Sequence, residues 1–103
     1  MALTKEFKET VAKRAKQDPE FKFELLLHAV NEFLHGDLEV AKLLLRDYIN
    51  ASPQFEAVAS EMNKNTKSIQ RMLGPNGNPT AENITSLFKA IQKLEGVKFR
   101  ARI

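Results

Sequence analysis

Residues that can hydrogen-bond to bases and phosphates gather in the segment 66–71. Lys67 and Arg71 are positively charged and can donate to guanine, and Gln70 can pair with adenine. Positions 62–81 hold three basic residues and no acidic one, so phosphates would meet no repulsion here. This pattern favours contact with nucleic acid. We predict that the contacting residues are Gln54, Asn65, Thr66, Lys67, Ser68, Gln70, Arg71, Asn76 and Asn78.

Two short helices would have to position these side chains. The sequence predicts one helix over 54–62 and another over 66–73, joined by a turn of three residues. Such a pair is typical of the helix-turn-helix arrangement, whose second helix enters the DNA major groove. Ala59 is small where the two helices would cross, and Asn63 suits a left-handed position in the turn. When the apolar residues of the second helix face inward, its basic residues face outward.

Capping signals predict the remaining helices. A residue that can cap a helix N-terminus stands at five places outside the second short helix, and proline follows it at two of them. Glycines at 36 and 96 supply the left-handed residues that end helices, and the segment 74–79 reads as a surface loop. The predicted helices therefore begin after Thr4, Asp18, Asp37 and Thr80, and the cap-plus-proline pairs are Asp18-Pro19 and Ser52-Pro53.

The end of the chain has a different period. Apolar residues alternate with Lys98, Arg100 and Arg102, as in a strand that is buried on one face. Because a strand needs a partner, it would have to pair with a short N-terminal stretch, with another protein or with a second copy of itself. We expect it to pair with a second copy across a two-fold axis. The predicted dimerisation residues are Val97, Phe99, Ala101 and Ile103.

Composition limits the classes of protein to consider. A chain of 103 residues with 43% apolar and 28% charged residues is ordinary for one globular domain. It has no cysteine, which excludes disulfides and thiolate metal sites. Its longest apolar runs are three residues, so no membrane span is expected, and the absence of a secretory signal predicts a cytoplasmic protein. The net charge of +3 is concentrated in the second half, since residues 1–50 hold eight basic and nine acidic residues and residues 51–103 hold eight and four.

A family resemblance adds to these patterns. The segment 55–80, and above all Arg71-Met-Leu-Gly-Pro-Asn-Gly-Asn-Pro79, resembles the lambda-repressor-like (Xre family) helix-turn-helix, in particular its addiction-module antidote branch of HigA-like antitoxins. Gly36-Asp37 and Leu45-Arg46-Asp47 resemble the upstream helices of that branch, so the resemblance covers roughly 23–96. It implies a five-helix DNA-binding fold, commonly dimeric, whose antitoxin members bind a toxin and repress their own operon. The chain departs from it at Asn63, where glycine is usual, and at Lys64, where an apolar residue is usual.

Catalytic and metal-binding alternatives have weak support. Glu32-x-x-His35 has the spacing of a carboxylate-bridged metal site, but the second motif that such a site needs is missing. There is no cysteine and no serine in a nucleophile motif. We therefore expect no enzyme activity, no metal and no cofactor, with both histidines at the surface or at helix ends.

Together these patterns predict an all-α, lambda-repressor-like bundle with an extra N-terminal helix and a short C-terminal strand. It divides into a helical extension (1–17), a helix-turn-helix DNA-binding domain (18–96) and a dimerisation arm (97–103). The expected function is that of a repressor binding an inverted-repeat operator in double-stranded DNA as a homodimer, and of the antitoxin of a type II toxin-antitoxin module with a cognate toxin as partner. The alternative is a helical protein-interaction module in which the helix-turn-helix is only scaffold.

Overall fold

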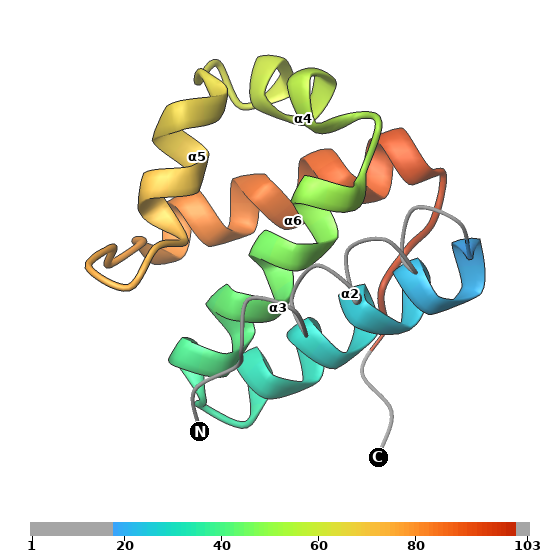
Figure 1. Cartoon of the computed structure of the whole chain (residues 1–103), viewed down its shortest axis with the longest axis horizontal. Coiled ribbons are helices and arrows are strands. Elements are labelled where there is room, and N and C mark those ends of the chain that lie inside the picture. Colours follow the sequence, from blue (N-terminus) through green and yellow to red (C-terminus); the bar gives the residue numbers. More distant parts are fainter. Residues whose placement is uncertain (1–17, 101–103) are drawn as a thin grey trace.

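The computed structural model describes residues 18–100, and helices account for most of them (Figure 1). Within this range no residue lies in a strand. The expectation of an all-α bundle is therefore confirmed for the described residues, and the predicted N-terminal extension 1–17 lies outside them. The helices are α2 (Pro19–Leu34), α3 (Leu38–Ala51), α4 (Phe55–Glu61), α5 (Thr66–Met72) and α6 (Ala81–Glu95).

α2 and α3 form an antiparallel hairpin that begins as the capping residues predict. The carboxylate of Asp18 accepts hydrogen bonds from the backbone N–H groups of Glu20 and Phe21, at 3.1 and 3.2 Å. Gly36 between the two helices has φ +89°, a value that glycine adopts without strain. Asp37 then caps α3 by accepting from the N–H of Val40 at 3.2 Å. The two helices pack along much of their length, as Figure 1 shows.

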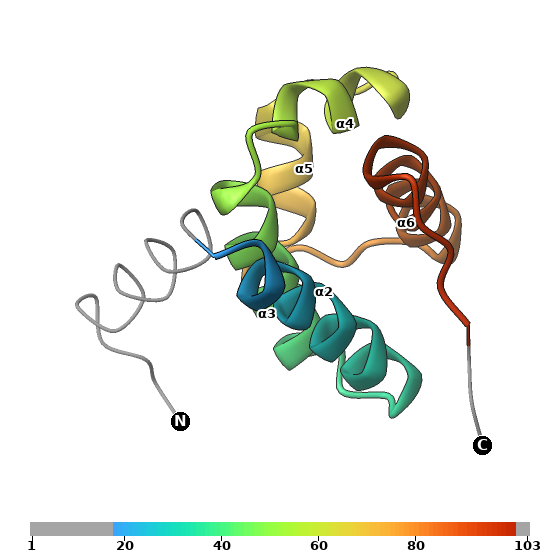
Figure 2. The ribbon, with the colours of Figure 1, turned by 90° about the vertical axis from the view of Figure 1, so that its right-hand side faces the viewer.

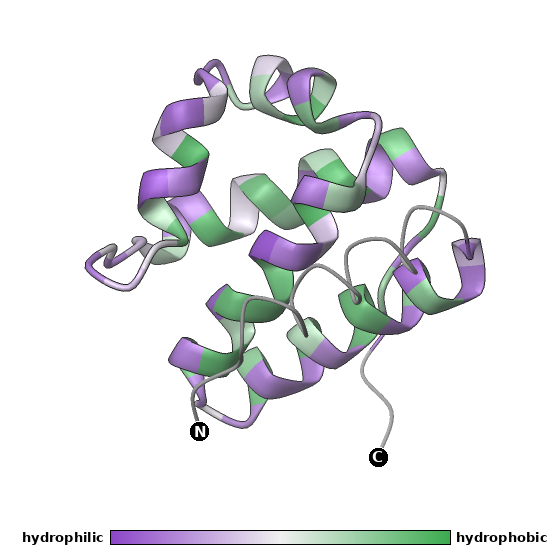
Figure 3. Ribbon diagram, viewed as in Figure 1, coloured by the Kyte–Doolittle hydropathy of each residue, from purple (hydrophilic) through white to green (hydrophobic). Residues whose placement is uncertain are grey.

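One hydrophobic core connects the five helices of residues 18–100. Every helix contributes at least one side chain that is almost fully buried, and apolar residues line the inner sides of the ribbons in Figure 3. Each buried side chain of this size contributes about 1.5–3 kcal/mol to stability. The largest of them are Leu26, Leu45, Tyr48, Ile49, Ile69, Leu73, Leu87 and Ile91.

A polar network ties three helices together at one edge of this core. The hydroxyl of Tyr48 on α3 donates to the Glu95 carboxylate on α6 at 2.8 Å, and Lys22 on α2 pairs with the same carboxylate at 3.2 Å. The Lys22 ammonium also lies 5.5 Å from the centroid of the Tyr48 ring. Burial, the hydrogen bond to Glu95 and its negative charge together raise the pKa of Tyr48 well above its ordinary value of 10.0.

The predicted C-terminal strand does not form in residues 97–100, and this expectation was wrong for them. After Gly96, whose φ is +68°, the chain runs back from the end of α6 (Figure 2). The N–H of Phe99 donates to the side-chain oxygen of Gln92 at 2.8 Å, and its ring packs edge-on against Phe88. A side chain of α6 thus takes the hydrogen bond that a neighbouring strand would have taken. Two of the predicted dimerisation residues lie outside the described range, Ala101 and Ile103.

The first of the two short helices begins one residue later than the sequence predicts. The helix predicted from 54 begins at Phe55, because the Ser52 hydroxyl accepts from the N–H of Gln54 at 3.2 Å in a turn that precedes the helix. Gln54 is therefore the N-cap, and its side chain makes no capping hydrogen bond.

Across residues 18–100, no helix has both the length and the apolar character that crossing a membrane requires.

Candidate nucleic-acid interface

A tight turn sets α5 at a fixed angle to α4. Asn63 has φ +55°, the left-handed conformation that the sequence predicts for this position. The N–H of Lys64 donates back to the carbonyl of Ala59 at 2.9 Å, and the N–H of Asn63 to that of Ser60 at 3.0 Å. Ala59 itself is only 3% exposed, as the prediction of a small residue at the helix crossing requires.

Buried residues on one side of α5 turn its polar residues outward. Ile69 is fully buried, and Leu73, at the C-cap of the helix, is 1% exposed. Lys67, Gln70 and Arg71 are consequently exposed, which confirms their predicted orientation. Among the other predicted contact residues, Asn65, Asn76 and Asn78 are exposed, and Gln54, Thr66 and Ser68 are partly buried.

Three of the predicted contact residues have their side-chain amides engaged or enclosed. The Asn65 oxygen accepts from the N–H of Ser68 at 2.8 Å and caps α5. Gln70 donates to the Asn50 side chain at 3.5 Å, a long contact that a better partner can replace. The side-chain oxygen of Gln54 is buried without a hydrogen-bond partner among the described residues. Asn65 is thus a structural cap first, and only its amide nitrogen is left for a ligand.

A hollow of about 520 Å³ lies between α5 and the loop 74–79. Its lining includes four of the predicted contact residues, two from α5 and two from the loop. No acidic residue lines it, and two cations do, so its charge suits a phosphate. The other five predicted contact residues lie outside this lining, namely Gln54, Asn65, Thr66, Lys67 and Gln70. Its lining residues are Lys64, Ser68, Arg71, Met72, Asn76, Gly77, Asn78, Pro79 and Asn83.

Lys64 belongs to this hollow although the sequence argument did not assign it a contact. It was noted only as a departure from the family pattern, where an apolar residue is usual. The available signal was its place among the three cations of the acid-free stretch 62–81.

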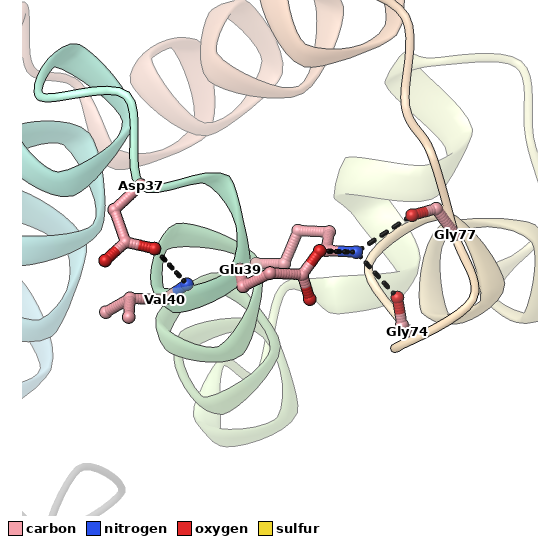
Figure 4. A network of polar contacts seen from close by, with 6 residues as sticks. Asp37, Glu39, Val40, Gly74 and Gly77 are labelled. Carbon is pink, nitrogen blue, oxygen red and sulfur yellow. Dashed lines mark hydrogen bonds and ion pairs between the residues drawn. The ribbon is translucent and has the colours of Figure 1, made fainter. Parts of the chain in front are cut away.

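Lys42 is the second residue that sequence reasoning missed. It is 2% exposed, and its ammonium donates to the backbone carbonyls of Gly74 and Gly77 at 3.1 and 2.8 Å (Figure 4). It also pairs with the Glu39 carboxylate at 3.1 Å. The signal was its position in the apolar stripe of α3, three residues before the fully buried Leu45.

Glycine at position 77 lets the loop lie directly against α5. A Cβ atom there would overlap the carbonyl oxygens of Arg71 and Met72. The N–H of Gly77 also donates to the carbonyl of Gly74 at 3.0 Å, which closes a turn that contains Asn76. The loop wall of the hollow is therefore in direct backbone contact with the helix that forms its other wall.

Comparison of the chain with protein-family models, with curated proteins and with solved structures finds no match. What this region does is therefore inferred from its own residues and their arrangement.

The described residues hold no assembled metal centre. Across residues 18–100, no group of three or more histidine, aspartate or glutamate side chains lies close enough together to hold a metal ion. His28 is exposed and lies 3.4 Å from Glu32 on the next turn of α2. His35 is exposed at the C-cap of the same helix, so both histidines lie at the surface.

Proposed function

We propose that the chain is a sequence-specific DNA-binding repressor in which α4, the turn and α5 act as a lambda-repressor-like helix-turn-helix. The observation that carries this proposal is the exposed face of α5. Lys67, Gln70 and Arg71 project from it, and its other side is anchored by the fully buried Ile69. A short helix with that division of residues can enter a major groove without exposing core.

The residues around α5 divide into two sets by their expected contacts. Lys67, Gln70 and Arg71 read base edges, where each good bidentate contact is worth about 1–3 kcal/mol of discrimination. Asn76 and Asn78, with the Lys64 side chain of the hollow, contact the phosphate backbone. Contacts of this second kind fix the position of the protein on the duplex without selecting a sequence.

The operator follows from the geometry of a dimer. Two copies related by a two-fold axis would place their α5 helices about 34 Å apart, one turn of DNA, on an inverted repeat. We propose the C-terminal segment from Val97 as the dimerisation arm. Control of its own operon as the antitoxin of a type II module, with a toxin as second partner, follows from the family resemblance alone.

Binding to DNA upstream of the gene tests the proposal. The purified chain should bind that duplex more tightly than a duplex of equal length and shuffled sequence. Its affinity should fall steeply with salt, with a slope of about −0.9 per neutralised phosphate on logarithmic axes. Equal affinity for both duplexes, or an affinity that salt does not change, would contradict it.

A helical protein-interaction module is the second candidate, and a specific surface favours it. On α2, Leu27 is 44% exposed and Leu34 is 62% exposed, large fractions for apolar side chains. They line one hollow together with Phe33, Phe88 and Phe99. If this were the only functional surface, a partner protein would bind while the duplex would not, so the same binding measurement separates the two candidates.

A further inference from the structure

We infer that Lys42 is a positioning residue for DNA binding, which holds the loop 74–79 in the shape that presents Asn76 and Asn78 to the phosphate backbone. The inference rests on the proposed DNA-binding function. Lys42 lies in α3, outside the two helices that would meet DNA, and only 2% of it is exposed. It therefore acts on DNA through the loop.

The ammonium of Lys42 has a full set of partners. An ammonium has three N–H donors, and three oxygens lie within hydrogen-bond distance. They are the carbonyls of Gly74 and Gly77 and the carboxylate of Glu39, at 3.1, 2.8 and 3.1 Å (Figure 4). A buried charge is stable only when it is paired in this way. The loop carbonyls are therefore required by the lysine as much as the lysine is required by the loop.

The place of this charge relative to α5 adds to its hold. Gly74 follows directly after Leu73, the C-cap of α5, where the last helical carbonyls carry partial negative charge. A cation near a helix C-terminus is favourable for that reason. Lys42 therefore stabilises the end of the proposed recognition helix and the start of the loop through one group.

The loop is held at three points around Asn76. Lys42 binds the carbonyls of Gly74 and Gly77, the N–H of Gly77 binds the carbonyl of Gly74, and the Gly77 backbone touches the end of α5. Asn76 lies inside this closed turn and lines the basic hollow. Because the loop is ordered before DNA arrives, binding does not have to supply the conformational entropy of fixing it.

The test compares DNA binding by the full chain and by two lysine variants. Lys42→Met keeps the length of the side chain and removes the three contacts, whereas Lys22→Met removes an equal charge that pairs with Glu95. We expect Lys42→Met to bind the upstream duplex about tenfold more weakly, ~1.4 kcal/mol. Lys22→Met should bind within about twofold of the wild type, ~0.4 kcal/mol. Thermal unfolding of each variant shows that it is folded at the assay temperature.

A double-mutant cycle with Asn76→Ala separates positioning from a general loss of stability. Asn76→Ala should weaken binding in the wild-type chain and have little further effect beside Lys42→Met, because the loop is then already misplaced. If Lys42→Met does not fold, Lys42→Gln takes its place, because its shorter, uncharged side chain has only two N–H donors and cannot make all three contacts of the ammonium.

The possible outcomes separate the positioning role of Lys42 from the proposed DNA binding. Weakened binding with loss of the Asn76 effect supports it. Lys42→Met that binds as tightly as the wild type, or effects of Lys42→Met and Asn76→Ala that simply add, would overturn the role of Lys42 and leave the proposed function standing. A wild-type chain that binds no duplex at low salt would overturn the proposed function and this role with it.

Discussion

Three exposed side chains of α5 carry the proposed reading of DNA. Among residues 18–100, the one polar contact of the Lys67, Gln70 and Arg71 side chains is the 3.5 Å hydrogen bond from Gln70 to the side chain of Asn50. Side chains that are exposed and weakly engaged can rearrange to meet base edges at little cost. Arg71 differs from Lys67 because it also lines the basic hollow, so it can reach a base or a phosphate.

Replacing these residues should change discrimination more than folding. Lys67→Ala and Arg71→Ala should each lower the preference for the upstream duplex over the shuffled one by about 1–3 kcal/mol, since a bidentate base contact is lost. Fluorescence anisotropy with both duplexes measures that preference. Lys93→Ala is a matched control, because Lys93 is an exposed cation on α6 that pairs with Glu61. An unchanged preference in both α5 variants would refute the assignment of base contacts.

Tyr48 makes stability depend on pH in the alkaline range. Its pKa is raised in the folded chain above the ordinary 10.0, so the folded state keeps a proton that the unfolded state releases. The contribution is fully present below pH 10 and is lost as the pH rises beyond it, by up to about 1.4 kcal/mol per pH unit. Tyr48→Phe should flatten this part of the denaturation profile relative to the wild type.

Tyrosinate absorbance gives an independent reading of the same effect. The chain has one tyrosine and no tryptophan, so the signal reports Tyr48 alone. It should appear above pH 10 together with the loss of helical circular dichroism. Ionisation near pH 10 in a chain that is still folded would show that burial and Glu95 do not raise this pKa.

At the level of the helices, the sequence predicted the N-caps correctly because each depends on residues close by in the chain. Asp18, Asp37, Asn65 and Thr80 all cap helices as predicted, because a capping hydrogen bond needs only residues two or three positions away. Ser52 accepts a hydrogen bond as well, but it closes a turn and shifts the helix start by one residue.

Contacts between residues far apart in the sequence could not be predicted from local patterns. Alternation of apolar and charged residues favoured a strand after Gly96, yet Phe99 found a partner in Gln92 of the preceding helix. Lys42 is bound to glycines that lie 32 and 35 positions further along the chain. The residues next to Lys42 in the sequence do not identify these partners. A lysine within an apolar stripe of a helix does indicate that its ammonium needs buried partners.

The left-handed conformation of Asn63 in the turn between α4 and α5 can be tested by mutation. Asn63 has φ +55°, where a Cβ costs free energy and asparagine is tolerated better than most residues. Asn63→Ala should therefore lower the free energy of unfolding by about 1 kcal/mol, and Asn63→Gly should leave it equal or higher. Urea denaturation measures both. Equal stability of the alanine and glycine variants would mean that the left-handed conformation does not persist in solution.

At the scale of the whole molecule, two different surfaces are available. The basic hollow is formed by α5 and the loop 74–79, and the apolar hollow by α2, α6 and the C-terminal segment, with no lining residue in common. A duplex on the first would leave the second open to a protein. The proposed DNA binding and the alternative protein binding would therefore not compete for one surface.

Two truncations separate the folding role of the C-terminal segment from its proposed role in dimerisation. A chain ending at Arg100 keeps the contact of Phe99 with Phe88, and a chain ending at Gly96 loses it. We expect both to sediment as monomers, and only the shorter one to lose about 1 kcal/mol of stability, the value of an aromatic pair. A dimer that persists in both would place the interface elsewhere.

An NMR titration can map the proposed DNA-binding surface directly. Amide chemical shifts of the isotope-labelled chain, recorded by NMR during titration with the upstream duplex, identify the residues that contact it. The largest changes should fall in residues 64–78, on α5 and the following loop, with little change around Leu27 and Leu34 of α2. No change on addition of the duplex, or changes centred on α2 instead of α5, would contradict the proposal that α5 is the recognition helix.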